Sequence, residues 1–133
     1  MKNREIEALI YDLDWNLSIE TQNNAINSLV EREDYDLAIL MQPLQTHKEL
    51  WENAAHVLVK KGYDKIKNHI DGLFKWLKDL NYPGAIIIYD FLRSIPKKDF
   101  DYYTDLYLSE ARKENDEDWE LYILQLIKNK KII

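Results

Sequence analysis

Hydrophobic residues recur along most of this chain at the three- and four-residue spacing of an amphipathic helix. Between proline, glycine and polar turn residues, this spacing predicts eight helices. Their expected ranges are 4–12, 18–31, 35–42, a fourth that opens at Thr46 and stops at Gly62, then 63–78, 83–94, 98–113 and 116–130. Only the stretch 85–89 is rich in strand-favouring residues, and its flanking pattern indicates a buried helix. The chain is therefore expected to be all-α.

Polar residues and prolines mark the ends of several predicted helices. Ser18 is a good N-cap, because its hydroxyl can accept a hydrogen bond from an unpaired amide of the first turn. Thr46 has Glu49 three residues on, which is the spacing of a capping box. Pro83 suits a first helical turn, where no amide hydrogen is needed. Pro43 closes the short third helix.

Four aromatic residues divide the chain at a nearly constant stride. These marker aromatics are Trp15, Trp51, Tyr82 and Trp119, which lie 36, 31 and 37 residues apart. Such a period is typical of a helix pair copied in tandem. We therefore expect four antiparallel pairs, in which each marker opens the second helix and packs between pairs, while an Asp or Asn before it caps that helix. The predicted fold is an all-α, HEAT-like right-handed α-solenoid that forms a single domain over residues 1–133.

Composition and charge limit the classes of function. The 133 residues include 18 basic and 24 acidic side chains, for a net charge of -6 and an isoelectric point near 5.1. An acidic surface repels phosphate backbones, so no nucleic acid is expected as a partner, whereas a basic protein is favoured. The lack of cysteine excludes disulfides and thiolate metal sites. With a charged start and no long apolar run, a cytoplasmic protein with no membrane association is expected.

Residues with catalytic potential form no familiar pattern in the sequence. His47, His56 and His69 lack the spacing of a metal-binding motif, and three glycines are too few for a phosphate-binding loop. Carboxylates are plentiful, but acid pairs without a cleft usually belong to the solvated surface. The sequence therefore predicts no catalytic residue, no metal and no cofactor, and so a protein that is not an enzyme.

Two stretches of the chain resemble a known family. Residues 73–85, L-F-K-W-L-K-D-L-N-Y-P-G-A, resemble the W-L-x-D-x-N-W-P-x-A signature of a family of small bacterial proteins of unknown function. Residues 115–124, N-D-E-D-W-E-L-Y-I-L, resemble its closing D-x-x-W-x-x-x-I-L segment. The resemblance covers residues 63–127, with Tyr82 in place of the usual Trp and Gly84 in place of Val. It implies a HEAT-like (armadillo-type) fold without catalytic residues, and relatives of such folds occur among immunity proteins of bacterial toxin systems.

The second helices of HEAT-like pairs line the concave face of the stack, so their polar residues off the apolar stripe are candidates for partner binding. With two aromatic anchors and the acidic turn before the last helix, the candidates are Glu20, Asn23, Asn24, Glu52, Asn53, Tyr89, Asp90, Asp116, Glu117, Asp118, Trp119 and Glu120. The acidic run 114–120 has two readings. It complements the dipole of the last helix, or it forms an acidic lip suited to an Arg/Lys-rich partner.

The sequence thus favours a non-catalytic protein-binding scaffold, most concretely a bacterial immunity protein that neutralises a cognate toxin by covering its active site. The alternative is an adaptor or regulatory HEAT-like module that binds a housekeeping protein or peptide. A HEAT-like base-excision enzyme is a third class, but it needs a positively charged cleft and this chain is acidic. The expected partner is a protein, basic if it is a toxin domain. The chain itself is expected to be a monomer or a weak homodimer.

Overall fold

The structure, a computed structural model, describes the backbone of residues 2–131 and the side chains of residues 4–131. In chain order its helices are α1 (Lys2–Tyr11), α2 (Ile19–Glu31), the 3-10 helices η1 (Leu37–Leu40) and η2 (Lys48–Leu50), α3 (Trp51–Lys61), α4 (Tyr63–Ile66), the 3-10 helix η3 (Lys67–His69), α5 (Ile70–Trp76), α6 (Ala85–Leu92), α7 (Lys97–Lys113) and α8 (Glu117–Lys128). No strand occurs within the described residues, so the all-α prediction is confirmed, including a helix over the strand-like stretch 85–89.

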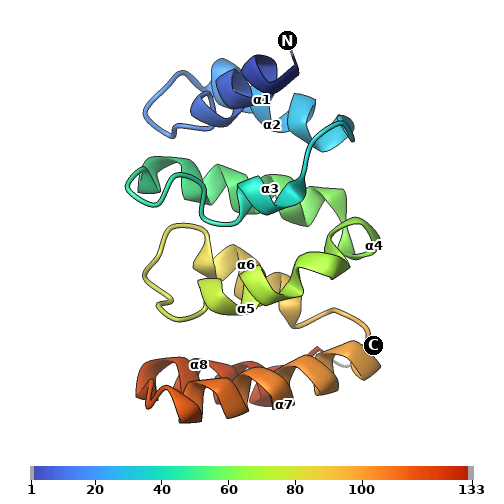
Figure 1. The fold of residues 1–133 in the computed structure, drawn as a ribbon, viewed down its shortest axis with the longest axis vertical. Coiled ribbons are helices and arrows are strands. Elements are labelled where there is room, and N and C mark those ends of the chain that lie inside the picture. The colour runs from blue at the N-terminus through green and yellow to red at the C-terminus, as the bar shows by residue number, and fades with distance from the viewer. Residues whose placement is uncertain (1, 132–133) are drawn as a thin grey trace.

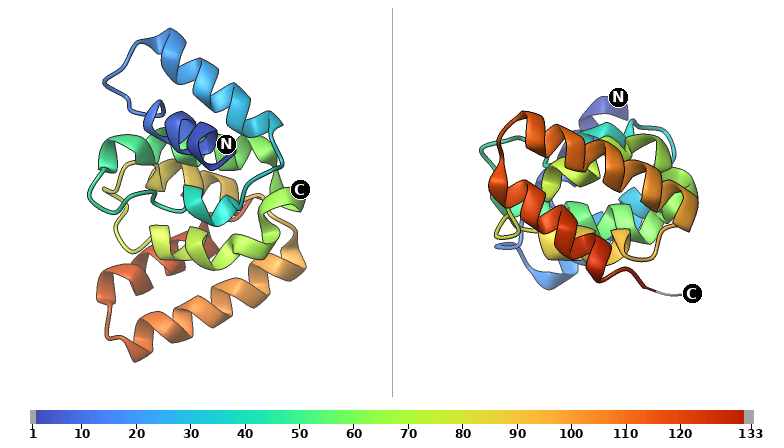
Figure 2. Two further views of the ribbon diagram at one scale, coloured as in Figure 1. Left: turned by 45° about the horizontal axis from the view of Figure 1, so that its top comes forward. Right: turned by 90° about the horizontal axis from the view of Figure 1, so that it is seen from below.

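The helices are stacked in pairs along the long axis of the molecule, and the members of the pairs form two layers that extend along this axis (Figure 1). One layer holds α1, η1, the α4–α5 segment and α7, and the second layer holds α2, α3, α6 and α8 (Figures 1 and 2). Within the second layer α3 contacts α2 on one side and α6 on the other, while α7 packs against α8 across the layers. Neighbours in the sequence are therefore also neighbours in space.

A continuous hydrophobic core runs between the two layers from α1 to α8. Its buried members include Ile10 of α1, Leu29 of α2, Trp76 of α5 and Ile123 of α8. Each helix pair has an apolar side that only the adjacent pair covers. Because burial contributes about 25 cal/mol per Å² of apolar surface, the stacking of pairs stabilises the molecule as a whole.

Polar contacts between the third and fourth helix pairs share one constant sequence offset. Four of them join side chains or carbonyls that lie 36 residues apart. They are Tyr63–Asp99, Asp71–Tyr107, Lys78–Glu114 and Arg93–Asn129. A constant offset means that a position on one pair contacts its counterpart on the next pair, as expected for a unit copied in parallel register.

The helix predicted at 35–42 is wrong, because only η1 forms there. The carboxylate of Asp36 accepts a hydrogen bond from the amide of Ala38 at 2.9 Å, which starts a tight 3-10 turn. Pro43 disfavours helical geometry at the residue before it. The short segment between Asp36 and Pro43 offers too few residues to offset the cost of nucleating an α-helix.

Two other predicted helices also change their limits. The capping box of Thr46 and Glu49 does not form; Glu49 instead contacts His47 Nδ1 at 3.1 Å, and the α-helix starts at Trp51 after η2. The single helix predicted at 63–78 is divided into α4, η3 and α5. Asn and His in η3 are weak helix formers, which favours the break at that point.

Helix α6 starts two residues after the predicted start, behind a tight turn. The amide of Ala85 donates to the carbonyl of Tyr82 at 3.0 Å, and Gly84 has φ 85° and ψ -14°. Residues 82–85 therefore form a type II turn, to which Pro83 belongs. A Cβ at Gly84 would also lie 2.9 Å from the carbonyl oxygen of Trp51. Both the dihedral angle and the close packing require glycine here.

The caps of the helices follow the prediction only in part. Ser18 caps α2 as predicted, and Asp116 caps α8 through a hydrogen bond at 3.1 Å. Asp14 and Asp79 instead accept hydrogen bonds at 2.8 Å from amides two residues on. These are Asx turns, which shape the chain before a helix without capping it.

The four marker aromatics occupy different environments. Trp51 and Trp119 are buried and Tyr82 is partly buried, whereas Trp15 is 44% exposed, so the prediction that all four pack between pairs is wrong for Trp15. The indole groups of Trp51, Trp76 and Trp119 each donate to a main-chain carbonyl at 2.9 Å. Trp76, which is not one of the markers, is fully buried and contacts Trp51 edge to face.

Candidate functional site

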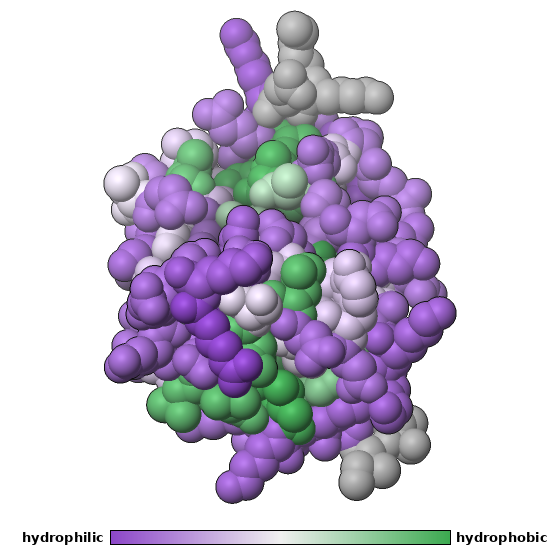
Figure 3. All heavy atoms as spheres, turned by 60° about the horizontal axis from the view of Figure 1, so that its bottom comes forward, coloured by the Kyte–Doolittle hydropathy of each residue, from purple (hydrophilic) through white to green (hydrophobic). Residues whose placement is uncertain are grey.

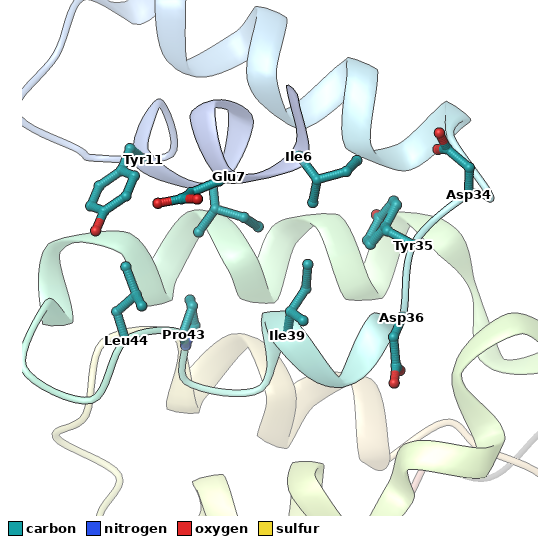
Figure 4. Close-up of a pocket in the computed structure, with 10 residues that line it drawn as sticks. Ile6, Glu7, Tyr11, Asp34, Tyr35, Asp36, Ile39, Pro43 and Leu44 are labelled. Atoms are coloured by element: carbon teal, nitrogen blue, oxygen red, sulfur yellow. The ribbon is translucent and has the colours of Figure 1, made fainter. Parts of the chain in front are cut away.

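A groove of about 400 Å³ lies between α1 and the linker that joins α2 to α3 (Figure 4). We call it the α1 groove, and its lining residues are Ile6, Glu7, Ile10, Tyr11, Asp34, Tyr35, Asp36, Ile39, Pro43 and Leu44. Most of its walls are apolar. Ile6 and Ile39 extend toward each other from opposite sides of the groove (Figure 4).

The groove exists because the linker lacks the helix predicted at 35–42. η1 has four residues, and residues 41–47 of the linker form no helix. Ile39 and Leu44 remain 40% and 44% exposed beside the buried Ile6 and Ile10. Because isolated apolar hollows of this kind mark binding surfaces in many proteins, the α1 groove is the candidate functional site.

Hydrogen bonds to main-chain carbonyls fix the position of the linker. The hydroxyl of Tyr35 donates to the carbonyl of Leu29 at 2.6 Å, and burial raises the pKa of this hydroxyl, so it stays protonated as a donor. The ammonium group of Lys61 donates to the carbonyls of Val30 and Arg32 at 3.0 and 2.7 Å. These contacts satisfy carbonyls at the end of α2 and connect the start of the linker to α2 and α3.

Backbone strain is found at the far end of the same wall. Gln42 and Leu44 have φ values of 50° and 47°, in the left-handed region that costs an ordinary residue about 1–2 kcal/mol. Between them, the carbonyl of Pro43 accepts a buried hydrogen bond from the indole of Trp51 at 2.9 Å. Strain of this kind persists only where surrounding contacts offset it, so Trp51 helps to hold Leu44 at the groove.

The charged residues that line the groove are all acidic. They are Glu7, Asp34 and Asp36, and the lining contains no lysine or arginine. Asp34 forms an ion pair with Arg32 at 2.8 Å, and Asp36 lies 3.9 Å from His69. An apolar floor with an acidic rim favours a ligand that carries apolar side chains flanked by basic groups.

The partner-binding residues predicted from the sequence lie in the second layer or in the turn before α8, outside the α1 groove. Those that are exposed are Glu20, Asn23, Asn24, Glu52, Asp90, Glu117 and Asp118. Those that are buried or partly buried are Asn53, Tyr89, Asp116, Trp119 and Glu120. The exposed residues stay a prediction.

Asn53 and Trp119 require a correction, because both side chains have structural roles in the interior. Asn53 is 7% exposed, and its amide donates to the carbonyl of Leu13 at 2.7 Å and to Oε1 of Gln22 at 2.9 Å. The amide of Gln22 in turn donates to two carbonyls of the α1–α2 turn. Trp119 donates to the carbonyl of Phe74. Neither side chain is accessible to a partner.

Other predicted residues already have partners within the chain. The hydroxyl of Tyr89 accepts a hydrogen bond from the amide of Asn129 at 3.0 Å, and Asp90 forms an ion pair with Arg93 at 2.8 Å. Glu120 forms an ion pair with a basic residue of α7 at 2.9 Å. Exposed ion pairs contribute less than about 1 kcal/mol, so a basic partner can compete for these carboxylates.

The groove residues were not among the sequence predictions. The sequence pattern instead predicts a helix over the segment 35–42. One local feature of the sequence indicates that this helix does not form: the run between Asp36 and Pro43 is too short for a stable α-helix.

The fold defines an all-α domain of two helical layers, and the comparisons place it in a family. Residues 43–133 match a domain of unknown function (DUF5071), and the chain belongs to this family. The prediction that the chain belongs to a family of unknown function is confirmed. Neither curated proteins nor solved structures gave a match. Within residues 2–131, no helix is long and apolar enough to span a membrane, and no cluster of three metal-ligating side chains is present.

Proposed function

We propose that this protein is a non-catalytic protein-binding scaffold, most concretely a bacterial immunity protein that neutralises a cognate toxin. The observation that carries the proposal is the α1 groove, which combines apolar walls with an exclusively acidic rim. An apolar floor provides affinity, and the acidic rim selects a partner with lysine or arginine beside its apolar side chains.

The proposed architecture is a HEAT-like, right-handed solenoid. Two layers of helices, a core that runs through all of the pairs, and the constant offset of 36 residues between the last two pairs support it. Scaffolds of this kind commonly bind other proteins through surfaces that extend over several repeats. Fold alone does not define function, so the proposal depends on the groove.

The chemistry of the groove fits a segment of a basic protein. Ile39 and Leu44 are partly exposed, and complete burial of such a side chain contributes about 1.5–3 kcal/mol relative to full exposure. Glu7 and Asp36 lie where lysine or arginine side chains of the partner can reach them. A toxin that acts on nucleic acid needs basic residues at its active site, and an acidic surface could cover them in the place of phosphate.

Co-expression with the product of the neighbouring gene tests this function. We expect the neighbour to arrest growth alone and the wild-type chain to restore it. Ile39→Asn in the groove is expected to lose protection, whereas Ile86→Asn, at an apolar position of α6 that is 61% exposed, is expected to retain it. Thermal unfolding must show that both variants fold. A harmless neighbour, or growth arrest that persists beside the wild-type chain, excludes the immunity role.

The adaptor alternative uses the same groove with a peptide of a housekeeping protein, in the helix-in-groove mode. Two fluorescent amphipathic peptides of equal length, one of Leu and Lys and the other of Leu and Glu, test the groove directly. Binding of the Leu/Lys peptide that Ile39→Asn weakens and Ile86→Asn preserves supports the groove. Equal binding of both peptides, or equal effects of both variants, contradicts it.

A further inference from the structure

Helix α8 has a second apolar face, which no element of the described chain covers. Leu121, Leu124 and Ile127 are 49%, 42% and 40% exposed, whereas Trp119 and Ile123 of the same helix are buried. Their spacing of three residues places them on one stripe of the helix. Figure 3 looks toward the end of the molecule formed by α7 and α8, where apolar side chains gather in a band with charged residues around it.

Charges are distributed unequally along this stripe. Glu120 lies four residues before Leu124, and Lys128 lies four residues after it. Four residues correspond to little more than one turn of an α-helix, so each charge lies beside one end of the stripe. One end of the stripe is therefore acidic, the other end is basic, and Leu124 is at the midpoint.

We propose that the chain self-associates through this face, with α8 of one copy antiparallel to α8 of a second copy and a two-fold axis at Leu124. In this arrangement Leu121 packs against Ile127 of the second copy. Glu120 lies opposite Lys128 of the second copy, and the symmetry repeats both contacts. A two-fold interface requires a surface complementary to itself, and the order of acid, apolar residue and base along α8 meets that requirement.

Charge complementarity supports a second copy as the occupant of this face. A parallel arrangement would place acidic ends beside each other, whereas the antiparallel one pairs opposite charges. Three apolar residues from each copy form less than the roughly 800 Å² per partner of a standard interface. The dimer is therefore weak and forms only at high protein concentration. The α1 groove belongs to the opposite end of the stack and stays open (Figure 1), so this inference does not depend on the proposed function.

Sedimentation equilibrium over a wide range of protein concentration tests the proposal. We expect a concentration-dependent dimer for the wild-type chain and a monomer for Leu124→Glu. The matched control is Ile19→Glu on α2, at a side chain that is 70% exposed, and it is expected to dimerise like the wild type. A wild-type chain that stays monomeric at every concentration, or a Leu124→Glu variant that still dimerises, overturns the proposal.

A charge exchange tests the antiparallel order. Lys128→Glu places two like-charged pairs across the interface and is expected to weaken association roughly tenfold. Adding Glu120→Lys restores opposite charges and is expected to restore association. Thermal unfolding of both variants controls for an effect on the fold, because Glu120 also has a partner on α7. If the double variant associates no better than the single one, the antiparallel register is wrong.

Cross-linking tests the position of the axis, because the natural chain has no cysteine. In Leu124→Cys, the two thiols lie together at the axis, so a short bis-maleimide is expected to give a covalent dimer. Ile19→Cys is expected to stay monomeric under the same conditions. Equal cross-linking of the two variants contradicts the proposed interface.

Discussion

Replacement of Asn53 by alanine removes the amide that connects α3 to the turn between α1 and α2. In the folded chain this amide donates to the carbonyl of Leu13 and to Oε1 of Gln22, at 2.7 and 2.9 Å. Leu13 is fully buried, so water cannot replace the lost donor there. The variant therefore leaves two acceptors without their donor in the interior.

The expected loss of stability follows from those two acceptors. A buried polar group without a partner costs about 1–3 kcal/mol. Because Gln22 can rotate part of its amide toward the turn, we expect a total of about 2–4 kcal/mol for Asn53→Ala. In a chain of this size that corresponds to a fall of roughly 10 °C in the melting temperature.

Urea unfolding followed by circular dichroism measures this difference, with Asn24→Ala as the matched control. Asn24 is exposed on α2, and its replacement is expected to change the free energy of unfolding by less than about 0.5 kcal/mol. If Asn53→Ala is as stable as the wild type, the buried network does not hold the turn. Loss of partner binding with unchanged stability would instead support the partner contact predicted from the sequence.

Other perturbations test separate parts of the structure by the same unfolding assay. Gly84→Ala is expected to cost about 2 kcal/mol or more, because the left-handed backbone disfavours alanine and the added Cβ would lie 2.9 Å from the backbone of α3. Gly72→Ala is the matched control. Its added Cβ would contact only the flexible side chain of Met41, and alanine favours the helix, so a much smaller effect on stability is expected. Tyr107→Phe removes the hydrogen bond that lowers the pKa of Asp71. A depressed pKa in the folded state stabilises the protein above about pH 4 and loses this effect as the pH falls. The variant is therefore expected to be less stable than the wild type at pH 7, and this difference is expected to shrink as the pH falls below about 4. Lys61→Ala removes the donor to the last carbonyls of α2 and is expected to cost about 1–2 kcal/mol at pH 7, and an unchanged value would contradict its capping role.

Most of the helices could be predicted from the sequence because local and long-range signals agree there. In α2 and α8 the cap residues Ser18 and Asp116 stand directly before a regular apolar stripe, and the structure starts both helices at these caps. The stripe of α7 is long, and the observed helix starts one residue before the predicted start and ends at the predicted residue. Periodicity reports which side of a helix is buried, so it succeeds where that side is covered along its whole length.

The remaining elements depend on contacts that periodicity does not report. Trp15 follows the stride of the markers, but its loop is held by main-chain contacts and the ring stays partly in solvent. Gly84 reads as a helix residue, although its role depends on the backbone of α3 lying against it. Asn53 reads as a polar surface residue because a pattern cannot show that a carbonyl from a distant turn reaches the same place.

The α1 groove and the failed helix prediction at 35–42 have one physical cause. In the first layer, α7 has 17 residues, whereas η1 is only four residues long, and Tyr11, Ile39 and Leu44 remain exposed between α1 and the linker. A helix or extended segment of a partner would take the place of the missing one and bury Ile39 and Leu44. The acidic rim then sets which segment can do so. Binding would complete the stack, and it would stabilise the α1–α2 pair by the free energy of association. Protein stability measured with and without the Leu/Lys peptide therefore reports on the same contact as the binding assay.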